Sequence, residues 1–515
     1  MHVSLNFAKL YHQKENNLPE FTLSRDILVE MQSTGSTLVT DENSKLEYNN
    51  RIQYMQENSK DTYNDEVKND QRILSQCENE NVFKLLTFNT WGLKYVSKFR
   101  KERLMAIADR LSAEDDISND YDIIALQEIW AKEDWEYIDE ACCKKYPFRR
   151  WFSSGMIAGP GLAVLSKYPI KKTFLYRFPI NGRPSAFHRG DWYVGKSVAV
   201  TILELFDGST IALLNSHMHA PYAKFGDAAY ETHRACQAWE IALIVEELKN
   251  AGHGVILVGD LNSRPGSLQY KILEKIAKLT DSWEVINGKT DLELVKNMDP
   301  WEQIIRAATT CDSILNTWRA DRAPDEACRL DYALVDCDVL QPLKATVEFT
   351  EKIPNVGSYS DHFAYSATFK IRKSFLNSTS GLENSDKNQS DDIDVESTMV
   401  FVSNEEKFQI YSELKNLVGD YINTTLKWQR KWRLWHFILS FIIAVAFLPV
   451  ITVVSYRAPW ASILFYFFGC VIFATGVING LISFLFGRYE LRNLREVILE
   501  VDDRVNYLKY KKGTE

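Results

Sequence analysis

The 515-residue sequence has few cysteines and no pattern that would join them into a structural unit. Its 8 cysteines are scattered and none forms a C-x-x-C pair. The adjacent Cys142 and Cys143 suit neither metal-ligand spacing nor a disulfide framework. We therefore expect reduced thiols that serve as small apolar side chains. The first residues (MHVSLNFAKLYHQKENN) also lack a long apolar run, so no secretory signal is predicted.

An excess of basic residues is missing as well, since the formal net charge is −9. Dedicated nucleic-acid binders usually carry a basic face, and we therefore expect no nucleic-acid partner, although an acidic chain can still hold a local basic cleft. Hydrophobic residues make up 45% and charged residues 25% of the chain. These are ordinary values for a globular protein and provide enough apolar material for a large core.

The composition changes several times along the chain. Residues 1–80 are polar with no sustained apolar period, which predicts a flexible N-terminal arm. Between residues 82 and 372, short apolar runs such as 82–88 alternate with helical patterns such as 232–250. Strands interleaved with helices over this length predict one α/β layered catalytic domain. The Ser/Asn/Asp-rich stretch at 376–398 predicts a linker.

Two apolar runs without charged residues follow, at 434–456 and 460–486. Each is longer than the roughly 20 residues needed to cross a bilayer core as a helix, and only three residues separate them. We expect a transmembrane hairpin, preceded by a juxtamembrane helix at 401–431 and followed by a cytosolic helical tail at 488–515. The alternative is a buried pair of core helices, which the length of the runs disfavours.

Basic residues flank both outer ends of this hairpin. Because Lys and Arg are retained on the cytoplasmic side of a membrane, we expect both termini and the catalytic domain to face the cytosol. These cations would also favour anionic phospholipids. The flanking residues are Lys427, Arg430, Lys431, Arg433, Arg488, Arg492 and Arg495.

Polar motifs close the expected strands of the catalytic domain. Each alone is most often a cap, a turn or a hydrogen-bonded core residue. Together they place carboxylates, carboxamides and imidazoles at one edge of a sheet sandwich, where oxygen donors suit Mg²⁺. In chain order the motifs are TFNTWG with Asn89, ALQE with Glu128, NSHMHA with His217, GDLN with Asp260 and Asn262, RLDYAL with Asp331, and YSDH with Asp361 and His362.

This ordered set resembles the endonuclease/exonuclease/phosphatase superfamily over about residues 82–372. Within it, the NSHMHA run and the apolar C-terminal pair are similar to the neutral sphingomyelinase branch, and most of all to fungal inositol phosphosphingolipid phospholipases C. The resemblance implies a two-sheet α/β sandwich and a Mg²⁺-dependent phosphoric diester hydrolase that releases ceramide from a sphingolipid.

The resemblance also implies a membrane setting. We expect an integral protein of the endoplasmic reticulum, the mitochondrial outer membrane or both. Anionic phospholipids (phosphatidylserine, cardiolipin and phosphatidylglycerol) would act as activators.

The metal and phosphate contacts implied by the resemblance fall on four residues. Glu128 would be the principal Mg²⁺ ligand, with Asn89 supporting the metal shell. Asn262 and His217 would contact phosphate oxygens. His217 and His219 share one face of a strand and could ligate zinc, but no nearby Cys or His completes such a site. We expect His219 to pack or hydrogen-bond behind the site.

The proton-transfer roles implied by the resemblance fall on the other residues. Asp260 would orient or deprotonate the attacking water. His362 would hold the developing charge or protonate the leaving oxygen, with Asp331 and Asp361 positioning its imidazole. Either Asp260 or His362 could be the general base.

The segment 190–197 (GDWYVGKS) fits the phosphate-binding pattern G-x-x-x-x-G-K-S. A working P-loop follows a strand and opens a helix. Here a loop-like stretch precedes the motif and a β-branched run follows it, so we expect no nucleotide binding. The neutral sphingomyelinase branch carries a similar element whose Asp and Lys act as a switch, and Asp191 and Lys196 match both residues. The alternative is a surface loop with an exposed ion pair worth ~0–1 kcal/mol.

Three other functions compete with this interpretation. A nuclease of the same fold is disfavoured by the acidic chain, because phosphate tracking needs a basic groove. An inositol-polyphosphate phosphatase of the same fold would act on a soluble substrate and would need no membrane hairpin. A catalytically inactive membrane scaffold is disfavoured because Glu128, Asp260, Asn262 and His362 are all present.

Overall fold

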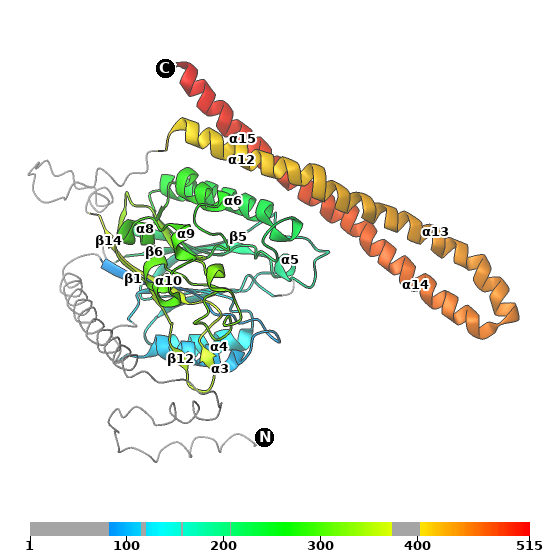
Figure 1. Ribbon diagram of the computed structural model, residues 1–515, viewed down its shortest axis with the longest axis horizontal. Coiled ribbons are helices and arrows are strands. Elements are labelled where there is room, and N and C mark those ends of the chain that lie inside the picture. Colours follow the sequence, from blue (N-terminus) through cyan, green and yellow to red (C-terminus); the bar gives the residue numbers. More distant parts are fainter. Residues whose placement is uncertain (1–81, 115–119, 156–157, 206–207, 373–401, 515) are drawn as a thin grey trace, which may run out of the picture. The chain divides into compact units, whose positions relative to one another are not determined.

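Two six-stranded sheets form the centre of the computed structural model, which describes residues 82–114, 120–155, 158–205, 208–372 and 402–514 (Figure 1). The expected N-terminal arm and the linker at 376–398 lie outside these residues. The first sheet has the strand order β11-β14-β1-β2-β4-β3 and the second β5-β6-β7-β8-β10-β9. This arrangement confirms the expected two-sheet α/β sandwich.

The strands of the first sheet are β1 (Val82–Asn89), β2 (Ile123–Gln127), β3 (Phe148–Phe152), β4 (Leu162–Ser166), β11 (Leu340–Glu348) and β14 (Ala364–Ile371). Those of the second are β5 (Ile170–Arg177), β6 (Ser197–Glu204), β7 (Thr210–His217), β8 (Gly254–Asp260), β9 (Thr280–Asp281) and β10 (Asp331–Val335). A small ribbon pairs β12 (Lys352–Ile353) with β13 (Gly357–Ser358).

Helices cover the outer faces of the two sheets. The longer ones are α3 (Arg100–Ser112), α4 (Lys132–Cys142), α6 (Glu231–Asn250) and α10 (Pro300–Ala307). Shorter segments are α5 (Asp191–Val194), α7 (Leu268–Lys271), α8 (Ser282–Asn287), α9 (Leu292–Val295), the 3₁₀ turns η2 (Asp227–Ala229) and η4 (Pro324–Glu326), and the π-turn η3 (Ile272–Ile276).

The side chains of β1 show how one strand serves two cores. Phe83 and Leu85 pack between the sheets against residues such as Val258 of β8. Leu86 and Phe88 point to the opposite side and pack with α3 and α4. Because side chains alternate along a strand, Asn89 at the end of β1 falls on the face that looks toward the second sheet.

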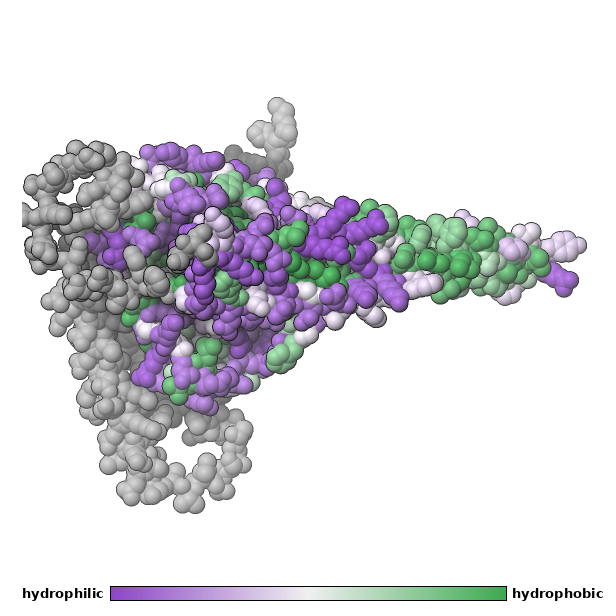
Figure 2. Space-filling view, turned by 90° about the horizontal axis from the view of Figure 1, so that it is seen from above, coloured by the Kyte–Doolittle hydropathy of each residue, from purple (hydrophilic) through white to green (hydrophobic). Residues whose placement is uncertain are grey.

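The C-terminal region consists of two continuous helical stretches. The first comprises α12 (Asn404–Tyr421), the π-turn η5 (Ile422–Leu426) and α13 (Lys427–Arg457). The second comprises α14 (Pro459–Leu481), the π-turn η6 (Ile482–Phe486) and α15 (Gly487–Thr514). Both are long and apolar enough to cross a membrane, and Figure 2 shows hydrophobic residues covering much of the paired helices. No break separates the expected juxtamembrane helix and tail from the expected spans.

The outer parts of this hairpin pack on the catalytic domain. Leu414 and Val418 of α12 and Leu494 and Val501 of α15 share a buried core with Trp239 of α6. Figure 1 shows α12 and α15 running beside α6. The expected juxtamembrane helix and C-terminal helical tail therefore pack against the catalytic domain.

Candidate active site

The register of the second sheet sets three site residues in one row. His217 at the end of β7 pairs with Asp260 at the end of β8, and Asp260 pairs with Asp331 at the start of β10. All three side chains are buried. Backbone pairing alone therefore places an imidazole and a carboxylate on either side of Asp260.

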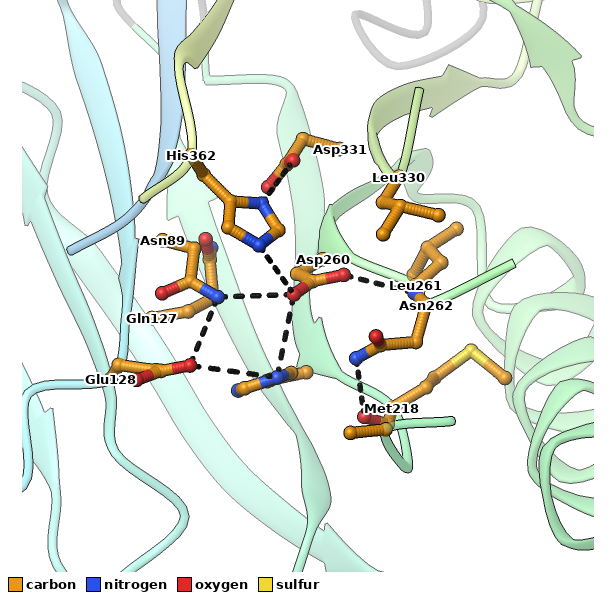
Figure 3. Close-up of polar contacts among 12 residues, drawn as sticks. Asn89, Gln127, Glu128, Met218, Asp260, Leu261, Asn262, Leu330, Asp331 and His362 are labelled. Atoms are coloured by element: carbon orange, nitrogen blue, oxygen red, sulfur yellow. Dashed lines mark hydrogen bonds and ion pairs between the residues drawn. The ribbon is translucent and has the colours of Figure 1, made fainter. Parts of the chain in front are cut away.

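Asn89 joins this row to the first sheet (Figure 3). Its Nδ2 donates to Glu128 Oε1 at 3.1 Å and to Asp260 Oδ2 at 3.0 Å. Asp260 Oδ2 also lies 3.4 Å from His217 Nε2 and 3.8 Å from His362 Nε2. One carboxylate oxygen is thus approached by nitrogens from three different segments of the chain.

Left-handed backbone conformations aim several of these groups. Trp91, Glu128 and Asn262 have φ angles of 49°, 64° and 47°, and each stands one or two residues beyond the end of a strand. Such conformations cost a non-glycine residue about 1–3 kcal/mol and gather at functional sites. At Asn262 the turn lets its backbone N–H donate to Asp260 Oδ1 at 2.9 Å.

Two carboxylates hold the imidazole of His362. Its Nδ1 lies 2.8 Å from Asp331 Oδ2, and its Nε2 faces Asp260. Burial opposes the charged imidazolium, but Asp331 and then Asp260 outweigh it and raise the pKa of His362 well above its ordinary value. The protonated form is therefore favoured at neutral pH.

The pKa values of Asp260 and His217 are also shifted, so that the groups of the cluster carry different charges at neutral pH. Burial, and to a lesser degree Asp331, raise the pKa of Asp260 to about 6. Burial, and then Lys196, lower the pKa of His217 well below its ordinary value. At neutral pH the site therefore holds an ionised Asp260, a charged His362 and a neutral His217.

Asp361 acts on His362 through its charge, which helps to raise the pKa of His362, and not through a hydrogen bond to the imidazole. Its Oδ2 accepts a hydrogen bond from Arg319 Nη2 at 2.6 Å, and Asp331 rather than Asp361 bonds the imidazole of His362. The reason is local, because Arg319 is held beside Asp361 by a second ion pair with Asp312. Asp361 also acts on Glu128, whose pKa is raised first by burial and then by the charge of Asp361.

The side-chain amide of Asn262 bonds to the backbone of a neighbouring segment. Its Nδ2 donates to the carbonyl of Met218 at 3.0 Å, next to His217. This bond fixes the position of the side chain beside Asp260.

Sequence reasoning missed the residues that hold the two sheets in register behind the site. Gln127 Nε2 donates to Asn215 Oδ1 at 2.8 Å, and Asn215 Nδ2 donates to the carbonyls of Leu126 and Ala163 at 3.0 Å each. Both amides lie inside the expected strands. Their only signal in the sequence was a polar side chain at a position that should be apolar.

Arg103 of α3 is a second missed residue. Its guanidinium is fully buried and donates to the carbonyls of Thr90, Trp91 and Tyr359 at 2.7–2.9 Å. Burial lowers the pKa of Arg103 to about 10. It ties the loop after Asn89 to the loop before His362.

Replacing Arg103 by methionine should therefore loosen both loops. The bond to the Thr90 carbonyl is buried, and those to Trp91 and Tyr359 are partly buried. A buried carbonyl left without a donor costs about 1–3 kcal/mol, so we expect a loss of at least about 1–3 kcal/mol of unfolding free energy. Denaturant unfolding would measure it. Lys101→Met, at an exposed position of the same helix, is the matched control and should change stability little. An Arg103→Met protein as stable as the control would contradict the proposed tie.

Two groups of residues could hold a metal ion. Ligand atoms of Asp260, Asp331 and His362 lie within 4.8 Å of one another, but His362 Nδ1 is already bonded to Asp331. Glu128 offers oxygen donors, and its side chain is 16% exposed, whereas that of Asp260 is 2% exposed. Since Mg²⁺ prefers oxygen ligands and keeps several waters, the surroundings of Glu128 and Asn89 fit it better.

The expected switch pair is buried. Lys196 Nζ lies 3.4 Å from Asp191 Oδ1, with side chains 3% and 7% exposed. The alternative of an exposed surface ion pair is therefore wrong. Tyr222 Oη donates to Asp191 Oδ2 at 2.7 Å. His219 stacks on Tyr230 with ring centroids 4.0 Å apart and is buried behind the pair.

The sandwich and its polar cluster define a phosphohydrolase of the α/β two-sheet class. Residues 86–362 match the family described as Endonuclease/Exonuclease/phosphatase. The chain belongs to this family, in the group of inositol phosphosphingolipid phospholipases C and sphingomyelin phosphodiesterases, which are phosphoric diester hydrolases.

Three relatives illustrate the match. "Inositol phosphosphingolipids phospholipase C" of Saccharomyces cerevisiae is 49% identical over 454 residues, covering 85% of this chain and 93% of that protein. The protein of the same name from Schizosaccharomyces pombe is 34% identical over 82% of this chain and 94% of that one. "Sphingomyelin phosphodiesterase 2" of Mus musculus is 31% identical over 56% and 66%, respectively.

Proposed function

We propose that the chain is a Mg²⁺-dependent phospholipase C that hydrolyses inositol phosphosphingolipids, with sphingomyelin as a further substrate, to ceramide and the phosphorylated headgroup. The observation that carries the proposal is the position of Asp260. Its Oδ2 lies between Asn89, His217 and His362, and Asn89 links it to Glu128. The names of the relatives supply the substrate class.

The charges of the cluster suggest a separate catalytic role for Asp260 and for His362. Asp260, ionised above about pH 6, would orient the attacking water and accept its proton at Oδ2. His362, held in the charged form, would protonate the leaving ceramide oxygen from Nε2. This assignment makes Asp260 the general base and His362 the general acid.

The remaining residues would bind the phosphate and the metal. Neutral His217 and the amide of Asn262 would contact phosphate oxygens. Glu128, with Asn89, would hold Mg²⁺, which when bound supplies Lewis-acid stabilisation of the phosphoryl oxygens.

Headgroup release tests the proposed substrate directly. Detergent-solubilised full-length protein would be incubated with mixed lipid extracts and Mg²⁺, and the released species identified by mass spectrometry. We expect inositol phosphates from sphingolipids together with ceramide. Release of inorganic phosphate from soluble inositol polyphosphates, or cleavage of nucleic acid with the lipids left intact, would favour the other activities of this fold.

The hairpin is proposed to anchor the enzyme in the membrane and to transmit lipid binding to the switch pair. Trp192 follows Asp191 directly, and its ring lies 5.2 Å from that of Phe486 at the end of the second apolar segment. On α6, His233 Nε2 lies 3.2 Å from Glu490, which also accepts a hydrogen bond from Tyr421 at 2.7 Å. These contacts offer a short path from the helices to Asp191 and Lys196.

Replacing Lys196 by alanine should leave the switch inactive. The charge of Lys196 lowers the pKa of both Glu128 and Asp260, and without it Asp191 loses its buried partner. We expect a rate loss of about 5–150-fold, the usual range for coupling between sites, and we expect this loss to persist at saturating Mg²⁺. Lys171→Ala, at an exposed lysine of β5, is the control. Activity fully restored by excess Mg²⁺ would mean that Lys196 acts only through the metal site.

Anionic lipid should activate through exposed cations next to the spans. Lys427, Lys431, Arg492 and Arg495 are exposed, and each contributes about 1 kcal/mol of attraction near an anionic surface. Substituting all four by glutamine should abolish the stimulation of mixed-micelle hydrolysis by phosphatidylserine, while activity without acidic lipid stays unchanged. Equal stimulation of the parent protein and the fourfold variant would mean that the hairpin only anchors the enzyme.

A chain shortened to residue 400 is a poor test of this activation, because its loss of α12 and α15 uncovers the apolar face of α6.

A further inference from the structure

A cavity of about 440 Å³ lies between β5, α6 and α15, and none of the candidate active-site residues lines it. Its volume falls within the ~300–1,000 Å³ range of small-molecule sites. Leu243 and Ile244 of α6 and Val497 of α15 supply apolar walls. The cavity therefore sits at the contact between the catalytic sandwich and the helix that continues from the second apolar segment.

One buried carboxylate in the wall lacks a partner. Glu240 is 7% exposed, and its Oε2 accepts no hydrogen bond from the residues that the structure describes. Its neighbour Glu500 does have one, since Trp239 Nε1 donates to Glu500 Oε2 at 2.7 Å. A buried acceptor without a donor costs about 1–3 kcal/mol, so a ligand that supplies the donor would be bound favourably.

The ionisable groups around the cavity are all acidic. Burial, and then the charge of Glu500, raise the pKa of Glu240 well above its ordinary value, so its carboxyl stays neutral until a cation lies beside it. Glu247, Glu496 and Glu500 line it together with Glu240, and no Lys or Arg is among the described lining residues. Acidic walls with an apolar floor complement a molecule that has a cationic head and a hydrocarbon chain. An anionic or zwitterionic lipid would bring a negative group against these carboxylates.

The position of the cavity indicates where such a molecule comes from. Asn493, on its rim, follows Phe486 by two helical turns, or about 10 Å. Phe486 ends the apolar segment that is long enough to cross a membrane. An amphiphile dissolved in the bilayer can therefore reach the cavity along α15.

We propose that this cavity binds a single-chain amphiphile with a primary ammonium head, a long-chain amine. When the ammonium group binds, Glu240 releases its proton to solvent and its carboxylate accepts a hydrogen bond from the ammonium. The chain packs against Leu243, Ile244 and Val497. The proposal does not rest on the catalytic function proposed above.

Photolabelling of the full-length protein in detergent micelles tests it. The probe is dodecylamine with a photoactivatable diazirine in its chain, and labelled peptides are mapped by mass spectrometry. The matched alcohol and carboxylic acid of the same chain length report simple partition into the micelle. We expect the amine to label peptides of α6 and α15 about tenfold more than either analogue, the size of one charge-assisted hydrogen bond.

Two substitutions and a control make the result specific. Glu240→Gln keeps the shape of the side chain and removes the carboxyl that ionises beside the ammonium, and Ile244→Trp fills the cavity. Both should reduce amine labelling of α6 and α15 by about tenfold. Glu231→Gln, at an exposed acid on the same helix, should not change it. If Ile244→Trp fails to fold, the amine labelling of Glu240→Gln alone tests the proposal.

Two outcomes would overturn the proposal. The first is equal labelling by amine, alcohol and acid, which means binding by partition only. The second is undiminished labelling of folded Glu240→Gln.

Discussion

Replacing Glu128 by alanine should abolish hydrolysis at every Mg²⁺ concentration and leave the protein folded. Glu128 follows the end of β2, and its carboxylate is the more open of the two that Asn89 joins. Removing the proposed metal ligand removes the main stabilisation of charge in the transition state, which costs orders of magnitude in rate. Turnover of the purified variant as a function of Mg²⁺ would measure this loss.

A conservative variant and a control distinguish the loss of the carboxylate charge from an effect on the backbone. Glu128 has a φ angle of 64°, a conformation that is unfavourable for every residue with a Cβ atom, so neither substitution changes this cost much. Glu128→Gln keeps the length of the side chain and removes only its charge. Glu128→Ala and Glu128→Gln should both be inactive, and both should melt close to the parent protein. Glu136→Ala, which removes an exposed carboxylate of α4, should keep full activity. Near-parental turnover by Glu128→Gln at saturating Mg²⁺ would refute the assignment.

The sequence predicted the sandwich because its signals are local. An apolar strand that ends in a polar motif marks a sheet edge, and the structure places Asn89 and Asp260 at such ends. Asp331 was also expected to close a strand, but it begins β10, which runs antiparallel to β8 and so brings Asp331 to the same edge. The convergence of these residues then follows from two parallel pairs, β1 with β2 and β7 with β8, whose carboxyl ends meet. Periodicity along a strand contains this information without any knowledge of tertiary contacts.

The contacts between distant segments could not be predicted in the same way. Asp331 bonds the imidazole of His362, whereas Asp361 accepts a hydrogen bond from Arg319, which lies in an irregular loop. The sequence alone does not show which of the two carboxylates has which partner. The packing of α12 and α15 on α6 was missed for a related reason. Charged residues on these helices suggested solvent exposure, whereas their apolar stripe, with Leu414 and Val501, is buried in the core.

The glycines of the hairpin illustrate a signal that was present in the sequence and not used. A Cβ added to Gly476 would lie 2.4 Å from Ser440 Cβ, and one added to Gly480 would lie 2.9 Å from the ring of Phe437. Small residues four apart let two membrane helices approach closely. Their spacing predicts a paired hairpin rather than two independent spans.

The pH dependence of hydrolysis should be bell-shaped, and its descending limb should belong to His362. Activity should rise as pH increases through about 6, where Asp260 loses its proton, and fall at higher pH as the imidazolium of His362 is deprotonated. Asp331→Asn removes the negative charge 2.8 Å from His362 Nδ1. Because that charge stabilises the imidazolium, the pKa of His362 should fall and the descending limb should move to lower pH. The dependence of kcat/KM on pH measures both limbs.

His362→Ala should lower the rate by about 10²–10⁴-fold, the usual contribution of a positioned general acid, and should remove the descending limb altogether. The matched control is His253→Ala, because His253 precedes β8 at the end opposite to Asp260 and bonds Thr210 rather than any site residue. It should keep both limbs. A purely structural role for His362 would lower the rate and leave the shape of the profile unchanged. A descending limb that persists in folded His362→Ala would assign the acid to another group, and one that does not move in Asp331→Asn would show that Asp331 does not set the charge of the imidazole.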